Sequence, residues 1–289
     1  MNRFGSALLG AAVLFLCPRP SVAQDIQPPP KVLVIMREFV KPGKSGAIHD
    51  KSESAFVQAF TKAKSNSHYL GMNSLSGKPR SLFFTGYDSF EAWEKDAEAT
   101  NKNAALSAAI DRALVADGEL LDSFDQAAFV FRDDFSINAT VDIAHMRYFE
   151  IEVFHTRPGR EAEWTEGTKL VLAALKKATP DAHFACYEGF YGAPGGTFLF
   201  ITPLKSASEV DRNIEHNKGF VEAMGESGMK KLGELSAASI ESSEANLFMF
   251  NPKMSYPPDA WIKADPDFWK PKPSASAAKP AAEKEKPAQ

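Results

Sequence analysis

The chain has 289 residues, of which 33 are basic and 37 acidic, and its formal net charge at pH 7 is −4. This length is enough to bury one large hydrophobic core or two smaller ones. The sequence carries no basic footprint of the kind that nucleic-acid-binding proteins use. We therefore expect no nucleic-acid partner.

The first 23 residues have the pattern of a secretory signal peptide. Arg3 gives a positive start, the apolar run Ala7–Cys17 is too short to span a bilayer, and Ser21–Ala23 places small residues before a cleavage site. We expect cleavage after Ala23, a periplasmic or secreted protein, and no membrane span. Cleavage leaves Cys186 as the single cysteine, which excludes an internal disulfide and favours a bacterial exported protein with an adequate core.

Residues 31–138 follow the order β-α-β-β-α-β. After the first strand, a Pro42-Gly43 turn leads into apolar residues at helical spacing. Asp88 and Glu91 match the Asx-x-x-Glu pattern of a helix N-terminus. Runs typical of strands occupy four stretches: 31–40, 68–75, 81–87 and 127–136. This order predicts a ferredoxin-like unit.

The second half repeats this order at a nearly constant offset. Gly43 aligns with Gly159 and His68 with His183, and the offset stays between 115 and 119 residues over four strands and two helical regions. We therefore predict a second ferredoxin-like repeat at 146–255. Because each unit leaves one sheet face bare, we expect an α+β fold in which the two sheets pack against each other as a barrel within one chain, with helices outside. Such a chain is a pseudo-dimer; further oligomerisation stays open.

Two segments follow the repeats. Residues 256–269 are Pro-rich and aromatic, and we expect an irregular strap that lays Trp261, Phe268 and Trp269 on the folded body. Residues 270–289 contain Lys, Pro, Ala and Glu but no large apolar residue. Such a segment cannot bury enough surface to offset its ordering entropy, so it is predicted to be disordered.

The repeated strand, Pro-Gly turn and helix, with "DSFEAWEKDAEATNKNAAL" at 88–106 and "EVDRNIEHNKGFVEAM" at 209–224, resembles the dimeric α+β barrel superfamily. That group includes antibiotic-biosynthesis monooxygenase-like, EthD-like and NIPSNAP-like proteins. The resemblance implies a barrel that is made here by one chain instead of two.

Some members of this superfamily degrade haem with an Asn on the first strand, a Trp on the second helix and a His about ten residues beyond it. Trp93 stands where the resemblance places the Trp. Met36 or Glu152 stands at the Asn position, and Asn103 stands at the His position. Haem is therefore disfavoured, and the cofactor, if any, is unknown.

Acidic residues on expected strands of the second repeat are the main candidates for chemistry. Glu150 and Glu152 replace Val34 and Met36 of the first repeat, and Glu188 lies on the strand that follows His183. Paired carboxylates can serve acid–base catalysis when their pKa values separate. The catalytic candidates are His183, Glu188 and Glu152. The ligand-binding candidates are Trp93, His155, Tyr187, Tyr191 and Arg37.

Each candidate has a plainer interpretation. The strand carboxylates can face solvent at a sheet edge, His183 can bond a loop, and Trp93 can be core. No His-x-His, His-x-x-x-His or His-x-x-Glu cluster with the spacing of metal ligands is present, so no metal site is expected.

Two functional hypotheses stay open. The first is a non-catalytic exported protein, structural or binding a small apolar or aromatic molecule. The second is a cofactor-free or haem-dependent small-molecule monooxygenase or isomerase with its site in the second repeat. Convergence of two strand carboxylates with His183 or His155 in a closed cavity would favour the second hypothesis.

Overall fold

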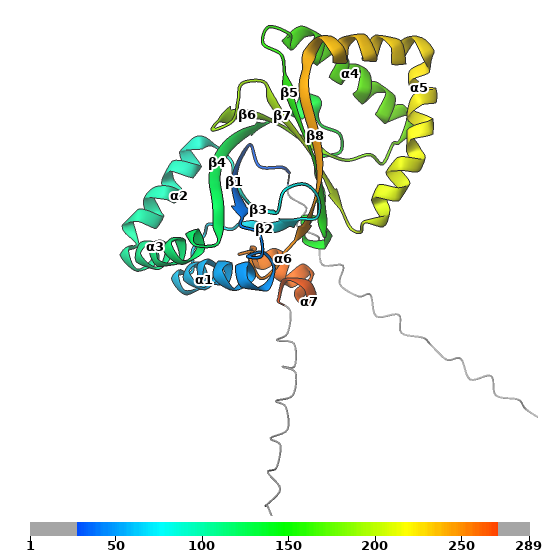
Figure 1. The fold of residues 1–289 in the computed structure, drawn as a ribbon. Helices are drawn as coiled ribbons and strands as arrows, with labels where there is room; N and C mark the ends of the chain where they lie inside the picture. The colour runs from blue at the N-terminus through cyan, green and yellow to red at the C-terminus, as the bar shows by residue number, and fades with distance from the viewer. Residues whose placement is uncertain (1–27, 271–289) are drawn as a thin grey trace, which may run out of the picture.

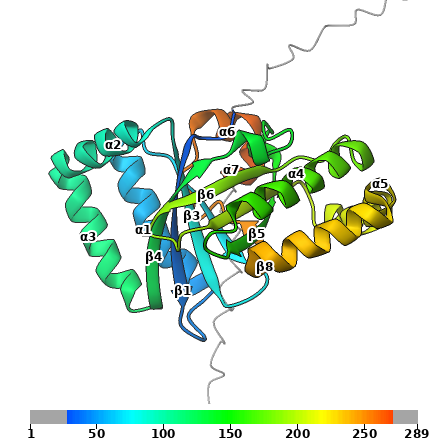
Figure 2. The same ribbon diagram turned by 90° about the horizontal axis from the view of Figure 1, so that it is seen from above.

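The computed structural model describes residues 28–270. Eight antiparallel strands close into a barrel in the order β1-β3-β2-β8-β5-β7-β6-β4, and the long helices lie outside it (Figure 1 and Figure 2). The predicted signal peptide, 1–23, and the predicted tail beyond Lys270 lie outside the described residues. Among the helices of residues 28–270, none is both long and apolar enough to cross a membrane.

Each repeat contributes four strands. The first comprises β1 (Val32–Val40), α1 (Ala47–Ala63), β2 (Leu70–Ser74), β3 (Arg80–Tyr87), α2 (Phe90–Lys102), α3 (Ala104–Gly118) and β4 (Leu121–Phe131). The short helices η1 (Asp133–Phe135) and η2 (Ile143–His145) connect it to the second. The second comprises β5 (Tyr148–Thr156), α4 (Glu161–Ala178), β6 (Ala185–Tyr191), β7 (Thr197–Leu204), α5 (Ser208–Ser239) and β8 (Ile240–Phe250).

The barrel closes through two seams between the repeats. The strands of the first repeat lie in the order β4-β1-β3-β2, and those of the second in the order β8-β5-β7-β6. Strand β2 pairs with β8 and β4 pairs with β6, so neither sheet keeps an unpaired edge. The predicted α+β fold of two ferredoxin-like repeats in one barrel is confirmed, as the resemblance to dimeric α+β barrel proteins implies.

Alternating apolar side chains fill the barrel. Leu33 and Ile35 of β1 and Ile151 of β5 belong to one buried core. Arg37 follows on the same face of β1, because side chains alternate along a strand. It pairs with Asp125 of β4 at 2.5 Å. That end of the barrel therefore carries charge, while the other end is apolar.

The two Pro-Gly turns hold equivalent positions. Gly43 between β1 and α1 has a φ of 77°, and Gly159 between β5 and α4 has a φ of 75°. Glycine adopts positive φ without the steric cost that a Cβ brings. These turns therefore mark the duplication.

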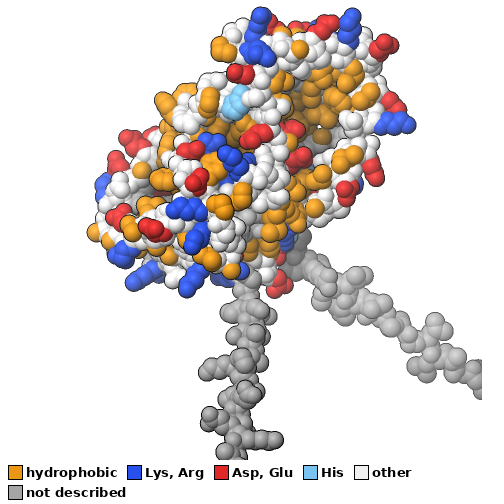
Figure 3. All heavy atoms as spheres, in the orientation of Figure 1, with side chains coloured by type: hydrophobic (Ala, Val, Ile, Leu, Met, Phe, Trp, Pro, Cys, Tyr) orange, Lys and Arg blue, Asp and Glu red, His pale blue; other side chains and the backbone are white. Residues whose placement is uncertain are grey.

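The outer helices cover the two sheets differently. In the first repeat, Phe90 and Trp93 of α2 pack near Val34 on the outer face of β1. In the second repeat, α5 packs chiefly against α4 and stands away from the sheet (Figure 1). Figure 3 shows a hollow lined by hydrophobic side chains beside it. Glu150 takes the place of Val34 on this face, where its side chain is half-buried.

The strap after β8 is helical where irregular structure was expected. It forms α6 (Asp259–Ala264) and α7 (Pro266–Trp269). Proline at the first position and the Asp265 side chain as N-cap favour α7. Trp269 is buried as expected, and its indole nitrogen donates to the Ala144 carbonyl at 2.9 Å.

Candidate functional site

The three catalytic candidates do not meet. His183 lies with Nε2 at 2.8 Å from the Pro203 carbonyl oxygen. Glu188 accepts a hydrogen bond from Arg132 at 2.5 Å. Glu152 is exposed on the outer face of β5. The contacts of the described residues thus give each side chain a separate environment, and the second-repeat acid–base site gains no support from them.

Of the ligand-binding candidates, Tyr187 alone lines a cavity within the described part of the chain. Trp93 packs beside Tyr87 and Phe90. Arg37 is engaged by Asp125, as described above.

The remaining two candidates lie outside the cavity lining. His155 contacts the Thr197 hydroxyl at 3.0 Å. Tyr191 is exposed and contacts Phe90 and Phe190 edge to face. Neither contact brings these side chains to the strand carboxylates.

The cavity occupies the apolar end of the barrel and has a volume of about 550 Å³. Its strand-borne lining is apolar or aromatic and includes Leu33, Leu70, Phe84, Phe149, Tyr187 and Ile201. Residues of the Pro28–Pro30 segment, η2 and α6 also line it. Both repeats therefore build this space, at the end of the barrel beside η2 and α6.

A few polar groups border the cavity. The Tyr187 hydroxyl donates to the Pro30 carbonyl at 3.2 Å, which fixes the ring against the N-terminal segment. Asp88, Asp142 and His68 also line the space, and the His68 ring stacks on Tyr256 with centroids 5.0 Å apart. Within residues 28–270, no Lys or Arg lines the cavity. The lining therefore favours an uncharged ligand over an anion.

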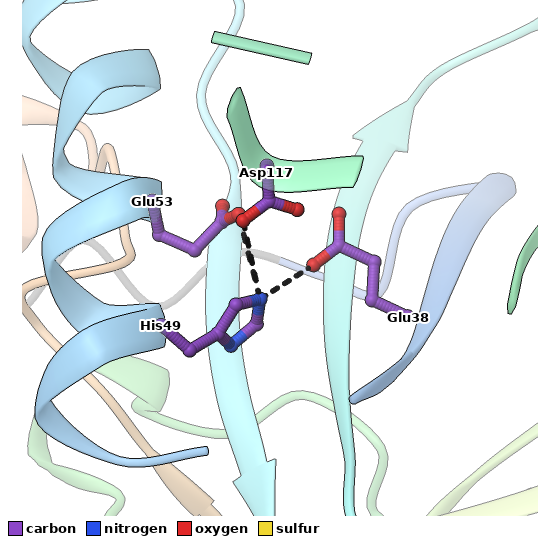
Figure 4. Close-up of side chains that lie close together, drawn as sticks. All are labelled: Glu38, His49, Glu53 and Asp117. Carbon is purple, nitrogen blue, oxygen red and sulfur yellow. Dashed lines mark hydrogen bonds and ion pairs between the residues drawn. The ribbon is translucent and has the colours of Figure 1, made fainter. Parts of the chain in front are cut away.

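A second candidate site lies between the first-repeat helices and the outer face of the sheet. Glu38 of β1, His49 and Glu53 of α1, and Asp117 of α3 converge there (Figure 4). All four are buried, with exposed fractions of 1–2%. Their four ligand-type atoms lie within 4.8 Å of one another. Full burial of three carboxylates with one imidazole is unusual unless they are protonated or coordinate a cation.

Burial sets the proton affinity of this cluster, which we call the quartet. Burial raises the pKa of Glu38, while the hydrogen bond to His49 opposes the rise. Burial, with the neighbouring negative charges of Glu38 and Asp117, raises the pKa of Glu53 to about 10. The quartet therefore resists carrying three negative charges in the absence of a cation.

One local signal for the quartet is present in the sequence. His49 and Glu53 are four residues apart, so a helix places them on the same face. The expectation of no metal site rested on the absence of His-x-His, His-x-x-x-His and His-x-x-Glu spacings and did not consider the His-x-x-x-Glu spacing of this pair. Glu38 and Asp117 lie on distant segments that only the tertiary fold brings to α1, and they had no signal of their own.

The open outer face of β5 gives a prediction of its own. Burial raises the pKa of Glu150 above its usual 4.5. Below pH 4.5 this carboxyl group is protonated in both the folded and the unfolded state and does not change the free energy of unfolding. As pH rises above 4.5 the unfolded state loses the proton first, so the folded state is progressively destabilised until pH passes the raised pKa. Glu150→Gln should therefore raise the Tm at pH 8 and leave it nearly unchanged at pH 4. Thermal unfolding at both pH values checks this.

The matched control is Glu94→Gln, which removes one negative charge from the exposed face of α2. Its Tm change should be small at both pH values. An equal Tm change for the two variants at pH 8 would assign the effect to net charge and not to burial of Glu150.

Comparisons with known proteins assign no family to the chain. No family model matches, and no curated protein matches. Among solved structures, the chain is similar to an anthrone oxidase-like protein at 14% identity and a TM-score of 0.49, over 76% of this chain and 92% of that one. A proposed monooxygenase of Fusobacterium nucleatum matches at 13% identity and 0.48, over 77% and 93%. A mutant chlorite dismutase from Candidatus Nitrospira defluvii matches at 11% and 0.46, over 81% and 95%. At these values the likeness carries no assignment of activity.

Proposed function

We propose that this protein binds a small, uncharged, apolar or aromatic molecule inside the barrel. The observation that carries the proposal is the cavity of about 550 Å³ at the apolar end of the barrel. That volume falls within the ~300–1,000 Å³ typical of small-molecule sites, which are concave, mostly apolar and furnished with a few polar groups.

The lining also supports the chemical class of the ligand. Phe84 and Phe149 pack with ring centroids 5.7 Å apart and offer aromatic surface. The acidic groups Asp88 and Asp142 and the absence of Lys or Arg from the described lining disfavour anions. Polar atoms at His68 and Tyr187 can orient a ligand that has one hydrogen-bonding group.

The alternative of an acid–base enzyme in the second repeat has weaker support. This alternative required strand carboxylates to converge with His183 or His155. Glu188, His155 and His183 instead contact Arg132, Thr197 and the Pro203 carbonyl. Export after cleavage at Ala23 stays a prediction of the sequence.

Equilibrium titration of the full chain with N-phenyl-1-naphthylamine, a neutral aromatic fluorophore, tests the proposal. We expect saturable binding of one probe per chain and a negative heat-capacity change in calorimetry, since apolar surface is buried. Non-saturable fluorescence, or a stoichiometry far above one, would indicate surface adsorption and contradict a defined cavity site.

A further inference from the structure

We propose that the first repeat binds one divalent transition-metal ion through the quartet Glu38, His49, Glu53 and Asp117. The ion would connect β1, α1 and α3 in a closed site formed by four protein ligands. This inference does not depend on ligand binding in the barrel.

The charges of the quartet are the first observation. Glu38, Glu53 and Asp117 have ion-pair contacts only with His49 among the described residues, and no Lys or Arg reaches them. Removing charged groups from water without a partner carries a large free-energy cost. One imidazole cannot balance three carboxylates, whereas a divalent cation with partial protonation can.

Unpartnered oxygen atoms are the second, independent observation. Oε1 of Glu53 and Oδ1 of Asp117 are fully buried and have no hydrogen-bond partner. Both side chains point toward the space beside His49 (Figure 4). Native proteins seldom leave two neighbouring buried polar atoms unsatisfied, so a ligand held between the Glu53 and Asp117 oxygens explains both.

The spacing of the atoms fits a single ion. His49 Nε2 lies 3.2 Å from Glu38 Oε2, 3.5 Å from Asp117 Oδ1 and 3.7 Å from Glu53 Oε1. A tetrahedral ion with bonds of about 2.1 Å separates neighbouring ligand atoms by about 3.4 Å. Small side-chain movements would therefore place all four atoms in coordination range.

The surroundings of His49 favour the ligand tautomer. Its Nδ1 faces the Ser81 hydroxyl oxygen at 3.4 Å. Ser81 gives its own proton to Asn73 Oδ1 at 2.7 Å, so its oxygen is free to accept the Nδ1 proton. In that tautomer Nε2 can bind an ion in place of the hydrogen bond that it shares with Glu38 Oε2 at 3.2 Å. Second-shell hydrogen bonds of this kind orient metal-binding histidines.

The second repeat shows that the fold does not require these charges. Its equivalent layer contains Phe154, Trp164 and Phe198, and the Trp164 ring lies tilted with its centroid 5.4 Å from that of Phe154 and 4.9 Å from that of Phe198. Phe154 pairs with Phe198 across β5 and β7 as Glu38 pairs with Ser81 across β1 and β3. The same layer between helices and sheet thus consists of aromatic side chains in the second repeat. The charged side chains at this place in the first repeat therefore indicate a ligand.

The donor set selects the kind of metal. One imidazole nitrogen and three carboxylate oxygens suit Zn²⁺, Mn²⁺ or Fe²⁺. Ca²⁺ prefers six to eight oxygen ligands and is disfavoured. Burial of all four side chains, with four protein ligands, is typical of a structural site.

Metal uptake by the full chain tests the proposal. The protein is dialysed against a chelator, then titrated separately with Zn²⁺, Mn²⁺ and, anaerobically, Fe²⁺, and its metal content is measured after removal of free ion. We expect one equivalent per chain for at least one ion. At a hundredfold excess over Kd, the Tm should rise by about 5–10 °C.

Glu53→Gln removes one ligand with little change of shape and should weaken metal binding at least about tenfold. Glu150→Gln, the matched control from the outer face of β5, should bind as the wild type does. If Glu53→Gln fails to fold by circular dichroism, the Co²⁺ absorption spectrum of the wild type decides. Intense ligand-field bands support the site. Three results would overturn the proposal. These are a Co²⁺ spectrum typical of the hydrated ion, no saturable uptake of any of the titrated metals, or an unchanged metal affinity in a folded Glu53→Gln protein.

Discussion

Ala185→Phe should lower the affinity of the barrel for N-phenyl-1-naphthylamine by at least about tenfold. Ala185 lines the cavity and is only partly buried, so a phenyl ring at this position projects into the space that the probe needs. The ring occupies volume that the bound probe would fill, and a loss of about 1.4 kcal/mol in binding free energy corresponds to a tenfold rise in Kd. Fluorescence titration of the variant measures the change.

The stability of Ala185→Phe separates blocked binding from damage. Because the ring enters existing space, the Tm should stay level or rise. Ala105→Phe is the matched control, since it adds the same ring on the exposed start of α3, outside the cavity lining. A folded Ala185→Phe protein that binds the probe with wild-type affinity would place the ligand elsewhere.

Trp269→Ala should destabilise the protein by about 3–5 kcal/mol, the range for truncating a buried aromatic residue. Trp269 contacts Phe250, Trp261 and Phe268, and its indole donates to the Ala144 carbonyl. Truncation leaves a void beneath the strap and an unsatisfied carbonyl. Urea unfolding followed by circular dichroism measures the free energy of unfolding.

Val115→Ala is the control for this loss of side-chain volume. Val115 lies on α3 with 76% of its surface exposed, and its truncation should cost less than about 0.5 kcal/mol. If Trp269→Ala also costs less than about 1 kcal/mol, the strap is not part of the cooperative core.

The sequence was informative about the fold because its repeat is long. Gly43 and Gly159, with the strands that precede them, hold equivalent turns in both halves. The strand carboxylates were harder to interpret. Glu150 and Glu152 were candidates for acid–base chemistry, but α5 packs on α4 and leaves the outer face of β5 partly open. Local sequence does not encode how far a helix stands from a sheet.

The quartet also could not be predicted from local sequence alone. The spacing of His49 and Glu53 on one helical face was present in the sequence but was missed, and Glu38 and Asp117 approach them only after β1, α1 and α3 pack together. The cavity also depends on tertiary structure, because strands from both repeats and the strap build its lining. The sequence suggested that the ligand is apolar or aromatic. The position of the cavity inside the barrel could be recognised only once the strands were seen to close into one sheet.

The most direct test of barrel binding is mass spectrometry of the protein purified from its natural source under native conditions. The account predicts a near-stoichiometric, uncharged organic molecule that is released on denaturation and that N-phenyl-1-naphthylamine displaces. Protein carrying the Ala185→Phe substitution should lack it. A clean apoprotein that also shows no saturable probe binding would contradict the proposed function.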